Sequence, residues 1–249
     1  MKPMIMPATP LSTSLQFLVN RARGRLRYRG GLCVNCLAPN ATDGLCQGCR
    51  EDLPANRWHC HTCALPLPFA SAGQRCGECL RNPPPFVRSI APWRYQFPVD
   101  RMISRYKYHG QTAFARPLLR LFCAQLDELM ADSPTPDVII PAPMDGQRQR
   151  RRGFNQAEDI AREAGRATGV PVNTDLVLRT RAVNAQRGLS RRERMANLAG
   201  VFFAPTDVPA RVAIVDDVVT TGATTRQLAR VLREAGAQEI QVWALARTP

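Results

Sequence analysis

Four Cys-x-x-Cys pairs crowd into a short stretch of this chain, and they constrain its fold more than any other feature. The pairs are Cys33/Cys36, Cys46/Cys49, Cys60/Cys63 and Cys76/Cys79. The turn in each pair can aim two sulfurs at one ion, and two such turns complete a tetrahedral zinc site. The spacing therefore predicts two small zinc ribbons, each with one structural zinc ion. We expect the first pair to join the second and the third to join the fourth, although a crossed arrangement satisfies the same count.

Disulfide bonds or redox use are the competing interpretation of these cysteines. Disulfides form in an oxidising compartment, and Pro7 and Pro10 interrupt the first apolar residues, unlike the continuous apolar core of a secretory signal. We therefore expect a cytoplasmic protein with metal-bound thiolates. No run of about 18 apolar residues occurs, so membrane insertion is not expected. The ninth cysteine, Cys123, lies in an apolar helical pattern and is expected in the core.

Three consecutive prolines at 83–85 mark a joint in the chain, because they cannot continue a helix or a central strand. We expect the joint to separate a double zinc ribbon at 31–82 from a larger domain at 86–249. Residues 1–30 precede both as a basic N-terminal segment, in which 11–27 can form a short amphipathic helix.

Helical and strand patterns alternate beyond that joint. Helical spacing of apolar residues occurs at 113–131, 154–169 and 224–236. Short apolar runs typical of buried strands occur at 137–143, 211–217 and 239–246, and 87–95 reads as a strand or a strand pair. This alternation predicts an α/β fold with a parallel sheet flanked by helices.

Two acidic residues followed by a stretch without bulky side chains mark the most distinctive site of the larger domain. Asp216 and Asp217 fall at the end of a predicted strand, where ligands gather in parallel sheets. The next residues open a helix, whose backbone N–H groups attract an anion. A ribose 5-phosphate satisfies both ends, with its hydroxyls on the two acids and its phosphate in the loop. The loop comprises Thr220, Thr221, Gly222, Ala223 and Thr224.

Arginine supplies almost all of the formal net charge of +14, since lysine occurs only at positions 2 and 107. Arginine favours bidentate contacts with phosphate, and its densest cluster follows the Pro-Ala-Pro-Met stretch at 141–144. We expect this cluster to hold phosphates or the backbone of a nucleic acid; a solvated basic loop is the alternative. The basic residues assigned to this role are Lys107, Arg148, Arg150, Arg151 and Arg152. Asn155 and Gln156, which follow, can cap the next helix.

The order of these motifs resembles the ComF/GntX family, in which a double zinc ribbon is fused to a type I phosphoribosyltransferase domain. Besides the cysteine pairs, the motifs are PPPF at 83–86, KYHG at 107–110, RRGFNQ at 151–156, GLSRRER at 188–194 and VDDVVTTGAT at 215–224. The resemblance covers residues 31–248. It implies a phosphoribosyltransferase-like domain at 86–249 that binds 5-phosphoribosyl 1-pyrophosphate (PRPP) together with magnesium.

The resemblance also assigns two further ligand-binding segments. A tight turn after the first strand of the site binds the pyrophosphate of PRPP; its residues here are Pro141, Ala142, Pro143 and Met144. An Arg-rich segment at 185–202 stands where relatives carry a mobile lid over PRPP, although a solvated basic loop is again the alternative. The lid candidates are Arg187, Ser190, Arg191 and Arg194.

Members of this family are associated with natural transformation and the use of DNA as a nutrient, beside a DNA-translocating helicase. The resemblance therefore implies single-stranded DNA and that helicase as partners. Two functions stay open: a phosphoribosyltransferase with an unidentified acceptor, and a non-catalytic competence factor that binds DNA and PRPP or a nucleotide. Thr220 stands where purine-using relatives carry an aspartate, which disfavours a purine acceptor. The aromatic residues that can stack bases, or pack in the core instead, are Trp93, Tyr106, Tyr108 and His109.

Overall fold

A five-stranded parallel sheet forms the centre of the computed structural model, which describes residues 31–70, 73–131, 133–180, 200–205 and 207–249. The strands are β1 (Arg88–Ile90), β2 (Trp93–Arg94), β3 (Val138–Pro141), β6 (Arg211–Val219) and β7 (Glu239–Arg247). Their order is β1–β7–β6–β3, and β2 also pairs with β7. Every pair in this sheet is parallel. The predicted α/β fold with a parallel sheet is confirmed, and the stretch at 87–95 is a pair of short strands.

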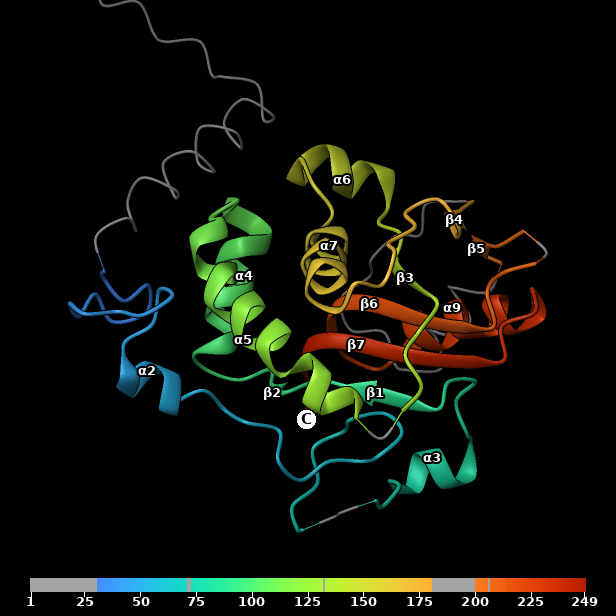
Figure 1. Ribbon diagram of the computed structural model, residues 1–249, viewed down its shortest axis with the longest axis horizontal. Helices are drawn as coiled ribbons and strands as arrows, with labels where there is room; N and C mark the ends of the chain where they lie inside the picture. Colours follow the sequence, from blue (N-terminus) through green and yellow to red (C-terminus); the bar gives the residue numbers. More distant parts are fainter. Residues whose placement is uncertain (1–30, 71–72, 132, 181–199, 206) are drawn as a thin grey trace, which may run out of the picture.

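Helices cover both faces of this sheet (Figure 1). The helices α4 (Val99–His109), α5 (Thr112–Met130) and α7 (Gln156–Thr168) pack on one face, and α9 (Ala223–Glu234) packs on the other. Along β6, Ala213 and Val215 belong to the first core, whereas Val212 and Ile214 belong to the core beneath α9. Successive strand residues point to opposite faces, so a strand buried on both faces is apolar throughout.

The helix α6 (Gly146–Arg152) carries the arginine cluster and has no counterpart among the predicted helices. Asp145 caps its first turn, because its Oδ1 accepts from the backbone N–H groups of Gln147 and Arg148 at 3.1 and 3.2 Å. Gly153 ends the helix with a φ of 81°, a conformation that favours glycine. Residues at both ends therefore specify this helix, although its interior has no apolar periodicity.

The helix α4 has no counterpart among the predicted helices either. Its buried side chains, Val99, Met102, Ile103 and Tyr106, follow helical spacing among charged neighbours. Gly110 ends the helix with a φ of 59°. The KYHG motif is therefore the last turn of α4 and its C-terminal cap.

The two cysteine ribbons pack against the sheet and its helices in different places. Their short helices, α2 (Gln47–Glu51) and α3 (Gly77–Arg81), lie on well-separated sides of the molecule (Figure 1). The first ribbon shares the core of α4 and α5, to which it contributes Cys33, Val34, Leu45, Cys49 and Leu53. The second ribbon has a small core of its own, formed by Cys60, Cys76 and Cys79. Cys63 of this ribbon also packs against the core beneath α9.

The proline joint is attached to α9. Arg226 Nη1 donates to the carbonyl oxygen of Asn82 at 3.1 Å, and Arg233 Nε donates to that of Pro85 at 3.2 Å. The division of the chain into domains at this joint stays a prediction.

A small antiparallel ribbon of β4 (Leu178–Arg179) and β5 (Phe202–Phe203) lies apart from the main sheet. In the part of the chain that the structure describes, no helix is both long and apolar enough to cross a bilayer. Residues 1–30, with the helix expected at 11–27, lie outside the described residues.

Candidate functional site

Each ribbon gathers four cysteine sulfurs into one cluster. The two clusters in the described residues are Cys33, Cys36, Cys46 and Cys49, and Cys60, Cys63, Cys76 and Cys79; the sulfurs of each lie within 4.8 Å of one another. Tetrahedral zinc with bonds of about 2.3 Å needs sulfurs about 3.8 Å apart. The Sγ–Sγ distance is 3.6 Å between Cys36 and Cys46, and 3.7 Å between Cys63 and Cys76. Each cluster therefore fits one metal ion, and the sequential pairing of the motifs is confirmed over the crossed one.

The same backbone geometry recurs in both clusters. The Cys46 and Cys76 sulfurs cap α2 and α3, each accepting from a cysteine N–H three residues later at 3.5 Å. Such contacts favour the thiolate, the form that binds metal. Hydrogen bonds from the Cys63 and Cys79 thiols also hold the pKa of Cys60 well below its usual range. All nine cysteines lie in the described residues and none is in a disulfide; Cys123 packs partly buried against the main core.

The Pro-Ala-Pro-Met turn and the two acids meet at the carboxyl edge of the sheet. Pro141 of β3 lies opposite Val215 of β6, and the Ala142 N–H donates to the Val215 carbonyl oxygen at 2.8 Å. The next residue along β6 is Asp216. The register of two strands thus brings together segments that are far apart in the sequence.

Asp217 is neutralised by Lys107, which reaches it from α4. The Lys107 Nζ lies 2.8 Å from Asp217 Oδ2, and the two side chains are 15% and 11% exposed. Burial by itself lowers the pKa of Lys107, but the charge of Asp217 more than offsets this and the pKa is raised. The charge of Lys107 is therefore directed at the acid, whereas the sequence pattern groups this residue with the arginines that contact phosphate or DNA.

Asp216 is a half-buried carboxyl group beside this ion pair. Its Oδ1 accepts from the Asp217 N–H at 2.8 Å. Burial, and then the charge of Asp217, raise the pKa of Asp216 from 3.8 to about 7, while Lys107 partly offsets them. A carboxyl group with a pKa displaced in this way is typical of a functional site. The pair of acids can accept hydrogen bonds from hydroxyls or hold a hard cation.

The Thr-Gly bend connects β6 to α9 as the sequence predicts. Gly222 has a φ of 73° and forms the N-cap of α9, where it offers no side chain to cap the helix. The Ala223 N–H donates to Thr221 Oγ1 at 3.4 Å. Thr220 is exposed and Thr224 is half-buried. The bend borders a cavity of about 460 Å³, whose other wall is the second ribbon.

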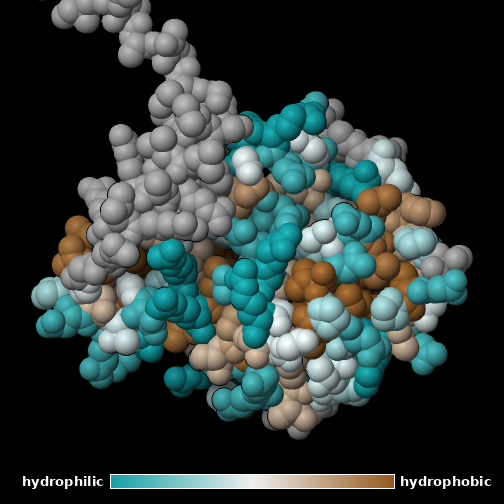
Figure 2. All heavy atoms as spheres, turned by 45° about the horizontal axis from the view of Figure 1, so that its top comes forward, coloured by the Kyte–Doolittle hydropathy of each residue, from teal (hydrophilic) through white to brown (hydrophobic). Residues whose placement is uncertain are grey.

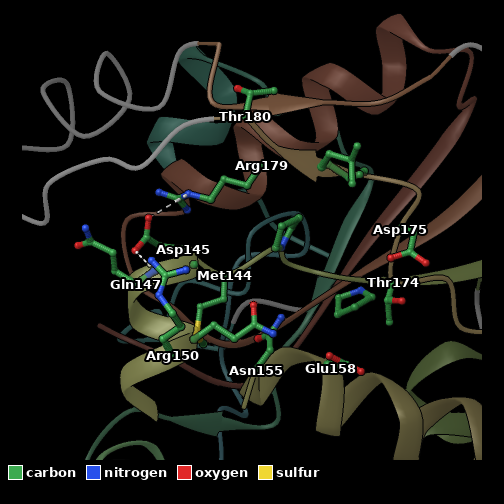
Figure 3. Close-up of a pocket in the computed structure, with 16 residues that line it drawn as sticks. Met144, Asp145, Gln147, Arg150, Asn155, Glu158, Thr174, Asp175, Arg179 and Thr180 are labelled. Carbon is green, nitrogen blue, oxygen red and sulfur yellow. Dashed lines mark hydrogen bonds and ion pairs between the residues drawn. The ribbon is translucent and has the colours of Figure 1, made fainter. Parts of the chain in front are cut away.

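A separate cavity of about 570 Å³ opens beside the Pro-Ala-Pro-Met turn (Figure 3). On one side of it, Arg179 Nε lies 4.0 Å from Asp145 Oδ2. Figure 3 shows Glu158 and Asp175 on the other side. Asp145 and Arg179 were not among the predicted site residues. Asp145 could have been found as an N-cap directly after the turn, whereas Arg179 comes from β4 and no local pattern marks it.

Residues of the RRGFNQ motif have structural roles here. Asn155 Oδ1 accepts from the Ala157 N–H at 3.1 Å, and its Nδ2 donates to the Ala142 carbonyl oxygen at 3.1 Å. One side chain therefore caps α7 and holds the turn. Gln156 is fully buried, and its Oε1 accepts from Arg152 Nη1 at 2.9 Å. Arg152 is thereby fixed between α6 and α7.

The exposed arginines of α6 form a basic surface. Arg148, Arg150 and Arg151 are exposed, and Figure 2 shows largely hydrophilic residues where this edge of the molecule turns toward the viewer. Tyr108 is 61% exposed, and its ring centroid lies 5.0 Å from the Arg152 guanidinium. Among the described residues this surface thus combines positive charge with an accessible aromatic ring.

The other aromatic candidates for base stacking do not reach this surface. Trp93 and Tyr106 are 4% and 1% exposed, so both are core residues. The side chain of His109 and the lid candidates Arg187, Ser190, Arg191 and Arg194 lie outside the described residues.

Comparison with known proteins finds similar chains that this chain matches over most of their length. No protein-family model matches this chain. It is 34% identical over 223 residues to competence protein F of Haemophilus influenzae, covering 86% of this chain and 96% of that protein. It is 36% identical over 225 residues to DNA utilization protein YhgH of Escherichia coli K12, covering 88% and 97%. Competence protein ComFC of Streptococcus pneumoniae is 31% identical over 163 residues, covering 65% and 69%.

A solved structure with partial overlap is the purine phosphoribosyltransferase from Pyrococcus horikoshii. It covers 53% of this chain and 71% of its own chain, with 24% identity and a TM-score of 0.33.

Proposed function

Because this chain belongs to the ComF/GntX family of competence and DNA-utilization proteins, we propose that it binds PRPP at the carboxyl edge of its sheet and serves in the use of incoming DNA. The proposal includes a soluble cytoplasmic setting beside the helicase that delivers the DNA strand. The acceptor of a phosphoribosyl group is not part of it.

The hydrogen bond from the Ala142 N–H to the Val215 carbonyl oxygen is the observation that carries the proposal. It places the turn at 141–144 beside Asp216, and the bend at 220–224 begins four residues after Asp216, at the end of the same strand. PRPP has its pyrophosphate and its 5-phosphate on either side of a ribose. The order of turn, acids and bend therefore matches the order of groups in this ligand.

The charges of the acids suit the ribose hydroxyls. Asp217 pairs with Lys107. Burial makes the charged form of Asp216 costly, so this carboxyl group gains by accepting a hydrogen bond from a hydroxyl. Asp216 and Asp217 would also hold Mg²⁺, directly or through water, since both offer hard oxygen ligands. Bound magnesium would neutralise the negative charge of the pyrophosphate. The amides and hydroxyls of the bend would hold the 5-phosphate.

Titration calorimetry with PRPP and Mg²⁺ tests this assignment. We expect saturable binding, and weaker binding of ribose 5-phosphate, because the contacts at 141–144 are then lost. Release of pyrophosphate on addition of bases, amines or oligonucleotides would identify a transferase. Binding without release would identify a non-catalytic competence factor. An absence of PRPP binding at millimolar concentration would contradict the proposal.

Single-stranded DNA is a second ligand that we propose, at the basic surface of α6. Its exposed arginines can contact phosphates, and Tyr108 offers a ring on which a base can stack. Such contacts are tolerant of sequence, as the uptake of foreign DNA requires.

An Arg150→Ala, Arg151→Ala variant is expected to bind a short oligonucleotide more weakly and with less salt dependence. The slope of log K against log salt should fall by about 1.4, because each phosphate contact contributes about 0.7 for a single strand. Fluorescence anisotropy over a salt series measures both quantities.

Arg162→Ala with Arg166→Ala provides the matched control. It removes the same formal charge, but these guanidinium groups lie 2.6 Å from Glu158 and Glu163, which already neutralise them. Equal losses of affinity in the two variants would show that only net charge matters, and would remove α6 as the binding surface.

A further inference from the structure

Arg247 is a buried cation at the end of β7, between the second cysteine cluster and the Thr-Gly bend. The residue is buried, with 7% of its surface exposed. It lines the cavity that separates the bend from the second ribbon. A guanidinium presents five donors in a rigid plane, so it can fix several acceptors relative to one another.

The contacts of Arg247 join these two parts of the chain. Its Nε donates to the carbonyl oxygen of Cys63 at 3.2 Å. Its Nη1 donates to the carbonyl oxygen of Val219 at 3.2 Å and also to that of Thr220. One side chain therefore connects a cysteine of the second cluster with the last residue of β6 and the first residue of the bend.

Fixing these carbonyl groups also fixes amides of the bend. The peptide group is planar, so the direction of the Val219 and Thr220 carbonyls sets the direction of the next two N–H groups, on Thr220 and Thr221. Arg226 adds a second attachment, from the first turn of α9 to the carbonyl oxygen of Asn82. The second ribbon thus holds the start of the bend, and Asn82, just before the proline joint, holds the first turn of α9.

We propose that Arg247 is a positioning residue that makes the order of the Thr-Gly bend depend on metal in the second cluster. Metal closes the loop that presents the Cys63 carbonyl, and Arg247 transmits this fixed position to the bend. We expect no such role for the first cluster, whose residues share the core of α4 and α5. The inference extends the proposed function, since an ordered bend is what a 5-phosphate would bind, but the order itself does not depend on that function.

Hydrogen exchange in the ligand-free protein tests this directly. In an Arg247→Met variant, the hydrogen-bonded amides within 219–224, such as that of Ala223, are expected to exchange at least about tenfold faster. This is the change expected from losing one hydrogen bond to a charged donor. Arg247→Lys should lie between this variant and the wild type, because it keeps the charge but not the rigid fork. Arg233→Met is the matched control. Like Arg247→Met, it removes a guanidinium that donates to a backbone carbonyl, but this carbonyl belongs to Pro85, at the far end of α9.

The cluster variants keep the test decisive if Arg247→Met does not fold. Cys63→Ser, in the second cluster, should accelerate hydrogen exchange in 219–224. Cys36→Ser, in the first cluster, is measured in parallel and should leave exchange there unchanged. Equal acceleration by both variants, or unchanged exchange in both Cys63→Ser and Arg247→Met, would overturn the inference. PRPP affinity should fall about tenfold in the variants whose bend exchanges faster. Faster exchange without any PRPP binding in the wild type would support the inference and refute the proposed function.

Discussion

An Asp216→Asn variant is expected to lose about 100-fold or more in PRPP affinity, which corresponds to about two hydrogen bonds to a charged acceptor. The amide keeps the shape of the side chain but replaces one acceptor oxygen with a donor, so the ribose hydroxyls lose a charged partner. Titration calorimetry in the presence of Mg²⁺ measures the change.

The same substitution is expected to make the ligand-free protein more stable above pH 7. Folding raises the pKa of Asp216 from 3.8 to about 7, so the folded state binds this proton more tightly than the unfolded state does. Stability is therefore lost as the pH rises from 3.8 to about 7, and the cost persists in full above that range. Asparagine carries no charge and avoids the cost. The Tm of Asp216→Asn should exceed that of the wild type at pH 8, and the difference in Tm should narrow at lower pH.

Asp217→Asn is the informative comparison, because its effect on stability has the opposite sign. It leaves Lys107 buried without its anion, which is expected to cost about 3–5 kcal/mol. Both variants should lose PRPP binding, but Asp216→Asn should be more stable than the wild type and Asp217→Asn less stable. Wild-type PRPP affinity in Asp216→Asn would show that this acid does not hold the ribose, and the proposed site would have to be abandoned.

Removal of metal from both clusters is expected to lower the Tm by on the order of 10 °C or more. Structural zinc sites have apparent binding free energies of about 10–16 kcal/mol, and 1 kcal/mol shifts the Tm of a chain of this size by about 2–4 °C. Elemental analysis should find two zinc ions per chain before chelation. Differential scanning calorimetry with and without a chelator measures the shift, and added zinc should reverse it.

The two clusters should differ in what they destabilise. Cys36→Ser should lower the Tm of the main transition, because Cys33, Val34 and Leu45 belong to the core of α4 and α5. Cys63→Ser should act mainly on the second ribbon, which has a small core of its own, and on the adjacent bend. An unchanged Tm after complete loss of metal would contradict a structural role for both sites.

The parallel sheet and the cysteine clusters could be predicted because their signals are local. Strands covered on both faces read as apolar runs, and each metal site is built from residues within one ribbon. The ion pair of Lys107 with Asp217 has no such signal. It joins a helix with few apolar residues to a distant strand, and only the packed fold brings the two together.

The roles of the arginines show the same limit. The density of positive charge in the sequence marks Arg148, Arg150 and Arg151 as a basic cluster, and all three side chains are exposed. It gives no reason to separate them from Arg152, which is fixed to Gln156, or from Arg247, which is buried against backbone carbonyls. Sequence reveals how much charge a segment carries, whereas the tertiary fold decides which charges remain available to a ligand.

The place of β7 has a consequence for how the protein is made. This strand lies between β6 and the pair β1 and β2, yet it is the last of them to leave the ribosome. Until β7 is synthesised, β1 and β2 lack their hydrogen-bonding partner, and the incomplete sheet is exposed to other chains. The cysteine ligands emerge long before that, so metal capture can precede completion of the sheet. Zinc supply during translation would then govern the yield of soluble protein as much as its final stability.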